Sequence, residues 1–284
     1  MLILSLSVGV VFMLGLREFQ MALRHEELTK ELLACIFEVH NEIGVGLDEE
    51  TYHQSLFDCL LRKGIPAVSK ERKQLVHRGV DIRKFELDLL TFEKIILALK
   101  ALHCDFLQNH YVQIFSELKL WKKDLGLLVN FGRQKAAIER LVFDEKEKKI
   151  VEDYSEVKGK IDESTRQGLA KFREALLYVF ETHGLGYGMV VCRDLLRAEL
   201  DHREITYSTN TPIYVKYRDK LVRTVKAKAI CITERFLCGI TALQDQITLF
   251  DVSRMRTYLK YSDVPIGLLV NFGKSNLEIK ALHR

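Results

Sequence analysis

The heptapeptide Gly126-Leu-Leu-Val-Asn-Phe-Gly132 recurs unchanged as Gly267-Leu-Leu-Val-Asn-Phe-Gly273. The difference in numbering between the copies (267 − 126 = 141), called here the heptapeptide offset, also aligns Ala101-Leu102 with Ala242-Leu243. Upstream, residues 36–46 (IFEVHNEIGVG) resemble residues 179–188 (VFETHGLGYG), with one residue fewer. A repeat of this length is too long for a solenoid, so these matches predict the duplication of a whole domain.

The duplication divides the 284 residues into four expected parts. An apolar extension, 1–24, precedes a first module, 25–143. A charged and poorly periodic connecting segment, 144–165, then precedes a second module, 166–284. We also expect the two modules to pack on each other with approximate two-fold symmetry, because duplicated domains often replace a homodimer.

Both modules show the same order of predicted elements. In the first module, helical periodicity over 28–39 and 52–61 is followed by strand-like runs at 74–77, 85–92 and 94–100, a helix at 105–119 and a strand at 125–130. In the second, strands are predicted near 213–218, 222–232 and 235–241, a helix near 245–260 and a strand at 266–271. This order predicts an α/β fold in which each module has a mixed sheet flanked by helices.

Charge and cysteine usage bound the class of protein. Basic and acidic residues balance over residues 1–150, with 22 of each, whereas residues 151–284 carry 21 against 17, which accounts for the net charge of +4. The six cysteines form no Cys-x-x-Cys pair and have mostly apolar neighbours: Cys35, Cys59, Cys104, Cys192, Cys231 and Cys238. This pattern favours packed, reduced thiols in a cytoplasmic protein over a disulfide framework or a zinc site.

The uncharged stretch at residues 1–16 leaves several interpretations open. It is shorter than the roughly 20 residues of a membrane span, and it lacks the basic flank of a signal peptide. Met21 opens MALRHEELTKELL, which suits the beginning of the first amphipathic helix. Residues 1–20 are therefore either an over-extended start, an unimportant extension, or a membrane-associated or secretory segment, and a membrane partner is not favoured.

A short motif follows the first predicted helix: Gly46-Leu-Asp-Glu49-Glu-Thr-Tyr52. It matches the G-x-x-E-x-x-Y signature. Together with FEVHNEIGVGL, the strand pair FELDLL–IILALKAL and the heptapeptide, it makes residues 26–142 resemble the GxxExxY proteins. These belong to the PD-(D/E)XK, or restriction-endonuclease-like, nuclease superfamily. The resemblance implies a Mg²⁺-dependent nuclease fold with DNA or RNA as its partner and no small-molecule cofactor.

The family pattern is an Asp on one strand, Glu-x-Lys on the next, and a glutamine on the following helix. Carried over by position, the resemblance implies Asp88, Lys100 and Gln113 as site residues. It adds Glu49 from the signature, with Asp88 and Glu49 as the metal ligands. The Glu of Glu-x-Lys falls on Ala98.

The substitution at position 98 matters because residues i and i+2 of a strand share a face. Position 98 and Lys100 therefore point into one pocket, where carboxylates hold Mg²⁺ and the ammonium stabilises developing negative charge. Ala98 offers no oxygen ligand, so we expect weak metal binding and little turnover. Glu86 and Glu117 are candidate replacements, and Glu86 is preferred because it alternates with Asp88 along the strand.

The second module is expected to have no nuclease chemistry. At the heptapeptide offset, Ala229, Gly239, Thr241 and Arg254 stand in the places of Asp88, Ala98, Lys100 and Gln113. The signature glutamate falls on Val191 and its tyrosine on Asp194. This module is therefore interpreted as a structural or binding partner of the first.

Six basic residues crowd residues 213–229 of the second module: Lys216, Arg218, Lys220, Arg223, Lys226 and Lys228. Tyr214 and Tyr217 lie among them. A basic hairpin with aromatic residues suits sequence-independent contact with a phosphate backbone. The alternative is a solvated edge whose lysines discourage aggregation.

Two functions from different classes remain. The favoured one is a nuclease-fold protein, catalytically impaired or inactive, that acts as a nucleic-acid-binding or interaction module. The alternative is a Mg²⁺-dependent, phosphodiester-cleaving nuclease that uses Asp88, Glu49 and Lys100 with a substitute acid such as Glu86.

Overall fold

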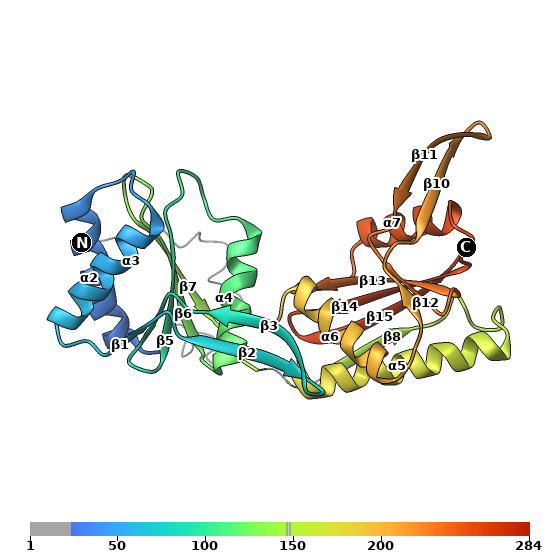
Figure 1. Ribbon diagram of the computed structural model, residues 1–284, viewed down its shortest axis with the longest axis horizontal. Helices are drawn as coiled ribbons and strands as arrows, with labels where there is room; N and C mark the ends of the chain where they lie inside the picture. The colour runs from blue at the N-terminus through green and yellow to red at the C-terminus, as the bar shows by residue number, and fades with distance from the viewer. Residues whose placement is uncertain (1–23, 146, 148) are drawn as a thin grey trace, which may run out of the picture. The chain divides into compact units, whose positions relative to one another are not determined.

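The computed structural model describes residues 24–145, 147 and 149–284, so the interpretations of residues 1–23 lie outside it. The chain forms two compact units: Met1–Arg72 with Glu86–Asp144, and Lys73–Phe85 with Glu145–Arg284 (Figure 1). Within the described residues, no helix is long and apolar enough to cross a membrane. The expected two-fold packing of the modules stays a prediction.

The first unit is a five-stranded mixed sheet in the order β1-β4-β5-β6-β7, with helices on both faces. Its helices are α2 (Glu26–Ile43), α3 (Glu49–Arg62) and α4 (Gln108–Trp121). Its strands are β1 (Ala67–Ser69), β4 (Leu89–Thr91), β5 (Ile95–Lys100), β6 (Leu125–Asn130) and β7 (Ala137–Val142). Strands β5 and β6 run parallel, joined through α4, and the other neighbours are antiparallel.

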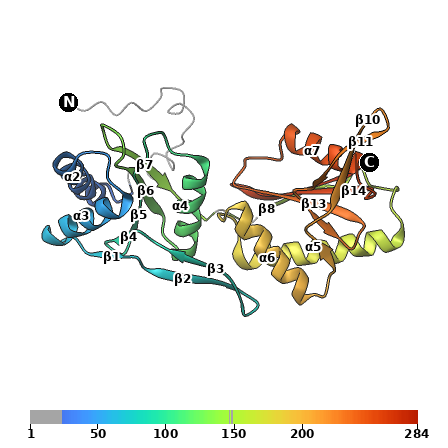
Figure 2. The same cartoon turned by 45° about the horizontal axis from the view of Figure 1, so that its top comes forward.

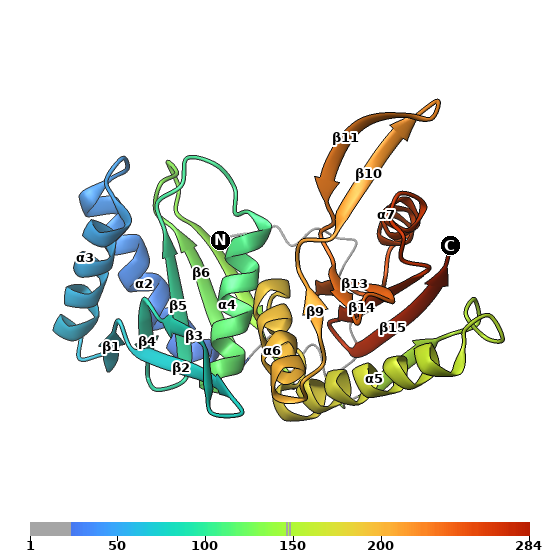
Figure 3. The same cartoon turned by 45° about the vertical axis from the view of Figure 1, so that its right-hand side comes forward.

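Alternation along β5 and β6 determines which residues meet which helices. Leu97, Leu99 and Leu127 belong to the core that α2 and α3 cover. The opposite face packs against α4. This helix lies so close to β6 that a Cβ added at Gly126 would be 2.7 Å from Ile114 Cδ1. Figure 3 shows α2 and α4 on opposite sides of these strands. Residues 96, 98 and 100 of β5 therefore share the face toward α4.

The second unit repeats this plan around a six-stranded sheet in the order β8-β15-β14-β13-β12-β9. Its helices are α5 (Glu163–His183), α6 (Met189–His202) and α7 (Leu249–Lys260). Its strands are β8 (Lys149–Asp153), β9 (Tyr207–Ser208), β12 (Ile230–Ile232), β13 (Phe236–Ala242), β14 (Ile266–Phe272) and β15 (Asn276–His283). Helix α7 lies on one face of the sheet and α5 and α6 on the other (Figure 2). The mixed α/β class is as expected.

Two hairpins complete the described fold. Strands β2 (Arg72–His77) and β3 (Val80–Glu86) form one two-stranded sheet, and β10 (Pro212–Tyr217) and β11 (Lys220–Lys226) form the other. Each turns through two residues with positive φ, Arg78-Gly79 and Arg218-Asp219. Most of the first hairpin, Lys73–Phe85, belongs to the second compact unit, although its sequence lies in the first repeat.

Two features of the fold differ from the sequence-based expectation, and a third, at Asn130, was not addressed by it. Strand β8 lies inside the segment 144–165 expected to be a connection, where it pairs in parallel with β15. Strands β7 and β15 follow the two heptapeptides and were not predicted. Asn130 joins the first heptapeptide to the loop after β5, because its side chain accepts the amide of Leu102 and donates to the carbonyl of Cys104.

The helical layer also corrects the alignment of the two repeats. Helices α3 and α6 have equal lengths and begin at Glu49 and Met189, a difference in numbering (189 − 49 = 140) called here the helix offset. The glycines that end the preceding helices, Gly44 and Gly184, differ by the same amount. The glutamate and tyrosine of the signature therefore correspond to Met189 and Cys192, whereas the sequence comparison placed them at Val191 and Asp194. The conclusion that no site carboxylate survives there is unchanged.

Candidate active site

Glu49 and Lys100 meet at the carboxyl end of β5. Glu49 is the first residue of α3, whose N-cap Asp48 accepts the amide of Thr51 at 2.8 Å. The Lys100 ammonium lies 3.4 Å from Glu49 Oε2. Burial raises the pKa of the Glu49 carboxyl, the charge of Lys100 opposes this, and the nearby carboxylate of Asp88 adds to it. The three predicted residues therefore interact electrostatically.

The signature tyrosine has a structural role in placing Glu49. Tyr52 is fully buried, and its hydroxyl donates to the carbonyl of Gly44 at 2.9 Å. Its ring stacks on Phe131 of the heptapeptide, with centroids 4.9 Å apart. These contacts join the turn before α3 to the end of β6, and so hold Glu49 at the same edge of the sheet as Lys100.

Asp88 lies between β3 and β4, with its side chain only 12% exposed. Its Oδ2 accepts the amide of Leu99 at 2.8 Å, and the Lys70 ammonium lies 3.3 Å from Oδ1. Although burial opposes it, the charge of Asp88 contributes to raising the pKa of Lys70. Lys70 was missed in the sequence, since nothing in Ser69-Lys70-Glu71-Arg72 distinguishes one basic residue from the other.

Ala98 is buried on the face of β5 that is turned toward α4, and no acid replaces it on the strand. Glu117 reaches this region from α4 and is 2% exposed. Gln113 donates to its Oε1 at 2.9 Å, while its Oε2 has no hydrogen-bond partner among the described residues. Burial, reinforced by the charge of Asp88, raises the pKa of Glu117 to about 8, against the opposing effects of Gln113 and Lys100.

Glu86, the preferred substitute acid, does not occupy this position. It ends β3, its side chain is 40% exposed, and it forms an ion pair with Arg72. The turn from β3 into β4 interrupts the strand alternation on which the preference rested. Of the two candidate replacements, Glu117 is the buried one beside the site.

The carboxylates of the site fit a metal ion only in part. Across the described ranges, no three His, Cys, Asp or Glu side chains are arranged to hold a metal ion. Mg²⁺, however, typically uses only one or two carboxylates and completes its shell with water and substrate phosphate. The carboxylates of Asp88 and Glu117 are near enough for their charges to interact, and the buried Glu117 Oε2 has no hydrogen-bond partner among the described residues. Glu49 is instead paired with Lys100.

The same end of the sheet carries a basic recess. Lys100 and Asn130 are paired at the ends of β5 and β6. The following loops line a recess with His103, Arg133 and Lys135. Arg133 is also paired with Asp105. A phosphate backbone in this recess would lie at the edge of the sheet where Lys100 ends its strand.

The second unit lacks the acids of this site. Gly239 and Thr241 replace Ala98 and Lys100 in the strand, and Tyr258 aligns with Glu117 at the heptapeptide offset. The added Cβ of a residue at 239 would lie 3.1 Å from Met255 Cε, so α7 packs directly on the strand there. The second unit thus has an apolar contact between helix and strand at the position of Ala98.

The six basic residues predicted to contact nucleic acid lie on or next to the β10–β11 hairpin, but on both of its faces. Val215 pairs with Arg223 and Tyr217 with Lys220, so these four share one face. Lys216 lies on the other face, because successive residues of a strand alternate. A bulge in β11 shifts the register between Val215 and Lys216, so the partner of Lys216 is Leu221.

Comparison with known proteins agrees with this architecture. A model of the PD-(D/E)XK nuclease superfamily matches the chain twice, over residues 26–141 and 167–282. No curated protein and no solved structure matches it. The two matches cover most of the chain and include every strand of the two sheets except β8, wholly or nearly to its end, so the protein belongs to the PD-(D/E)XK nuclease superfamily, in tandem duplication.

Proposed function

We propose that the first unit is a divalent-metal-dependent nuclease whose second acid has moved from the strand to α4. The observation that carries the proposal is the Glu117 carboxyl, buried beside Asp88 with one oxygen unpaired. A buried acid without a full set of partners costs about 1–3 kcal/mol or more. A bound cation would remove this cost, whereas a purely structural role would favour an apolar side chain at position 117.

Each residue has a distinct part in this proposal. Asp88 and Glu117 would hold the ion, which would polarise the phosphate and activate water. Lys100 stabilises negative charge that develops on the phosphate. Glu49 orients the Lys100 ammonium through the contact at 3.4 Å, and the amide of Leu99 orients Asp88 through the bond at 2.8 Å. Gln113 orients Glu117.

The proposal differs from the function favoured by the sequence, an inactive interaction module, because that interpretation rested on the alanine at position 98. Ala98 and Glu117 are two halves of one change. A small residue on the strand leaves room for a glutamate from the facing helix, whereas the second unit has a small residue, Gly239, but Tyr258 in place of the glutamate.

Cleavage of supercoiled plasmid and single-stranded DNA or RNA in Mg²⁺ or Mn²⁺ tests the proposal. Loss of partners behind a metal ligand already costs 10–100-fold, so Asp88→Ala and Glu117→Gln should each reduce cleavage at least about 100-fold. Glu86→Gln is the matched control, since it removes a nearby acid that is paired with Arg72 at the surface. A natural protein that cleaves none of these substrates, or cleavage that Glu117→Gln leaves intact, contradicts the proposal.

A further inference from the structure

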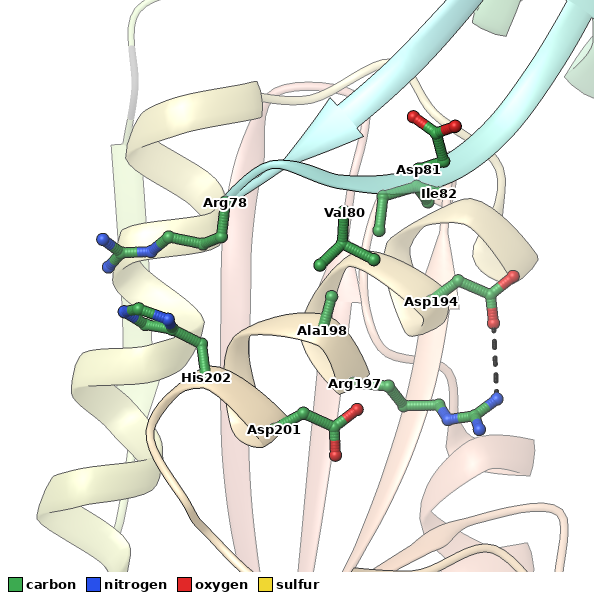
Figure 4. Close-up of a pocket in the computed structure, with 9 residues that line it drawn as sticks. All are labelled: Arg78, Val80, Asp81, Ile82, Asp194, Arg197, Ala198, Asp201 and His202. Carbon is green, nitrogen blue, oxygen red and sulfur yellow. Dashed lines mark ion pairs between the residues drawn. The ribbon is translucent and has the colours of Figure 1, made fainter.

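The β2–β3 hairpin is seated on the helices of the second unit through a buried polar contact. His77 is 2% exposed, and its Nε2 lies 2.8 Å from Oε2 of the fully buried Glu199. Arg78 donates to both oxygens of Glu199, at 3.1 and 3.2 Å, and its guanidinium lies 3.8 Å from the centre of the Tyr178 ring. Arg203 also pairs with Glu199. Figure 4 shows Arg78, Val80 and Ile82 of the hairpin beside α6.

The equivalent β10–β11 hairpin has no such seat. Counting back from the two-residue turns, Tyr217 and Arg218 correspond to His77 and Arg78. Tyr217 is 67% exposed, and Leu221 and Val222 are 52% and 65% exposed. In Figure 1 the hairpin projects from its unit beyond α7. An exposed apolar and aromatic hairpin is typical of a surface that binds a partner.

The residues of α5 and α6 that hold the β2–β3 hairpin, here called the socket, have counterparts in the helices of the first unit. At the helix offset, Tyr178, Glu199 and Arg203 correspond to Glu38, Cys59 and Lys63. The carboxylate has moved from the second helix of the pair to the first, but it keeps its cation: Glu38 pairs with Lys63 and accepts from Cys59. Unlike Glu199, Glu38 is accessible, with its side chain 38% exposed. Leu61, on the same helix as Cys59, is 51% exposed.

Charge favours the pairing of this counterpart of the socket with the second hairpin. Helices α2 and α3 together carry eight acidic residues and two basic ones, whereas α5 and α6 carry six and five. The β10–β11 hairpin carries five basic residues against one acidic residue, Asp219. Opposite charges on two surfaces increase the rate and specificity of their association. This basic hairpin is therefore complementary to the acidic helical layer of the first unit.

We propose that the β10–β11 hairpin docks on the α2–α3 face of a second copy of this chain, as the β2–β3 hairpin sits on α5 and α6. Arg218 pairs with Glu38, and Tyr217 packs between α2 and α3 beside Cys59, the counterpart of Glu199. The occupant is a second copy because both surfaces are exposed in the single chain, and because the seated hairpin provides the template for the contact. The inference is independent of the nuclease proposal.

The test is the mass of the full chain, freed of nucleic acid, measured by sedimentation velocity from about 1 to about 100 μM, where interfaces of modest strength assemble. The natural chain should exceed its monomer mass of 32.9 kDa as concentration rises. Arg218→Glu and Glu38→Arg should each weaken association at least about tenfold, and the double variant should regain it. Such reciprocal rescue requires direct contact between the two side chains.

Lys216→Glu is the matched control, because it reverses a charge of the same hairpin on the face away from Tyr217. It should leave association unchanged. A monomer at every concentration overturns the proposal, whether the hairpin is free or folds back on its own chain. Equal loss of DNA retention in Lys216→Glu and Arg218→Glu, with no change in mass, also overturns it and identifies the hairpin as a nucleic-acid surface instead.

Discussion

The two units of this chain share a fold and a heptapeptide. Only the first has a lysine at the end of its parallel strands and a buried glutamate on the helix that covers them. On the first sheet, Lys100 ends β5, and Glu117 faces that strand from α4. On the second, Thr241 and Tyr258 hold these positions, and α7 packs closely on Gly239. Both copies keep the same frame because the buried apolar runs of their parallel strands are kept, whereas the site depends on a few polar residues that packing does not require.

In the paired helices, α2 with α3 and α5 with α6, it is the second unit that buries a carboxylate, Glu199. The loss of this group should have the largest effect on stability. Glu199 is fully buried among Arg78, Arg203 and His77, and despite its burial these partners lower its pKa to about 2. Glu199→Gln should reduce the free energy of unfolding of the second unit by about 3–5 kcal/mol, because three donors lose their charged partner. Glu38→Gln should have a far smaller effect, because solvent screens the ion pair of its accessible carboxylate.

Urea denaturation of the two variants at pH 7 measures this difference. Because the pKa of Glu199 is lowered, its contribution is complete above the unfolded value of 4.5 and is lost as the pH falls toward 2. The difference between Glu199→Gln and the natural protein should therefore shrink across that window. Equal costs for the Glu199 and Glu38 variants would show that burial does not distinguish the two carboxylates.

Glu117 and its counterpart Tyr258 should differ in the pH dependence of stability without metal. The pKa of Glu117 is raised to about 8, so the native state holds a proton that the unfolded chain releases near 4.5. Stability is therefore lost as the pH rises from about 4.5 to about 8. Glu117→Gln should remove this loss and stabilise the protein by roughly 2–4 kcal/mol at pH 9 in EDTA.

The control for this prediction is Tyr258→Phe, which changes the equivalent position of the second unit but removes no carboxyl, so the loss of stability between about pH 4.5 and about pH 8 should remain. Thermal unfolding monitored by circular dichroism between pH 5 and pH 9 compares the variants. A natural protein whose stability is independent of pH over this range would contradict the burial of an unpaired acid at position 117.

The smallest predicted effect concerns the shared heptapeptide. A Cβ at Gly126 would meet the branched side chain of Ile114 at 2.7 Å, and one at Gly267 would meet Met255 at 2.5 Å. Overpacking of a core costs about 1–3 kcal/mol. Gly126→Ala should fall in this range, whereas Gly267→Ala should cost less, because the unbranched methionine can change rotamer. Calorimetry of the two variants measures the difference, and a larger cost for Gly267→Ala would contradict this account of packing.

The sequence predicted the repeat and its strongly periodic elements. Short, continuous apolar runs identified β5 and β6, and the turn glycines separated α2 from α3. Asp88, Lys100 and Glu49 were identified by resemblance, and the structure brings them together. Strands β7 and β8 were not predicted because their residues are only partly buried or exposed, so they depend on a neighbouring strand more than on a pattern of their own. Strand β15 was missed although Leu277, Ile279 and Ala281 alternate with polar residues and are buried.

The rest of the site could not be predicted from the sequence, because it depends on how distant elements pack. Whether Glu86 or Glu117 replaces the missing acid depends on where β3 ends and on which face of the sheet α4 covers, and neither is determined by local spacing. The alignment of FEVH with FETH was also misleading, because the buried positions of α2 and α5 correspond at the helix offset. The seat of the β2–β3 hairpin joins residues far apart in the chain, such as His77 and Glu199.

The central claim, that Glu117 completes a metal site with Asp88, is tested most directly by titration of Mn²⁺ followed by electron paramagnetic resonance at pH 8. We expect one bound ion per chain, with affinity lowered at least about tenfold in Glu117→Gln and in Asp88→Asn and unchanged in Glu86→Gln. If Glu117→Gln binds Mn²⁺ as tightly as the natural protein, the acid on α4 is not a ligand, and the first unit is a nuclease fold without its second carboxylate.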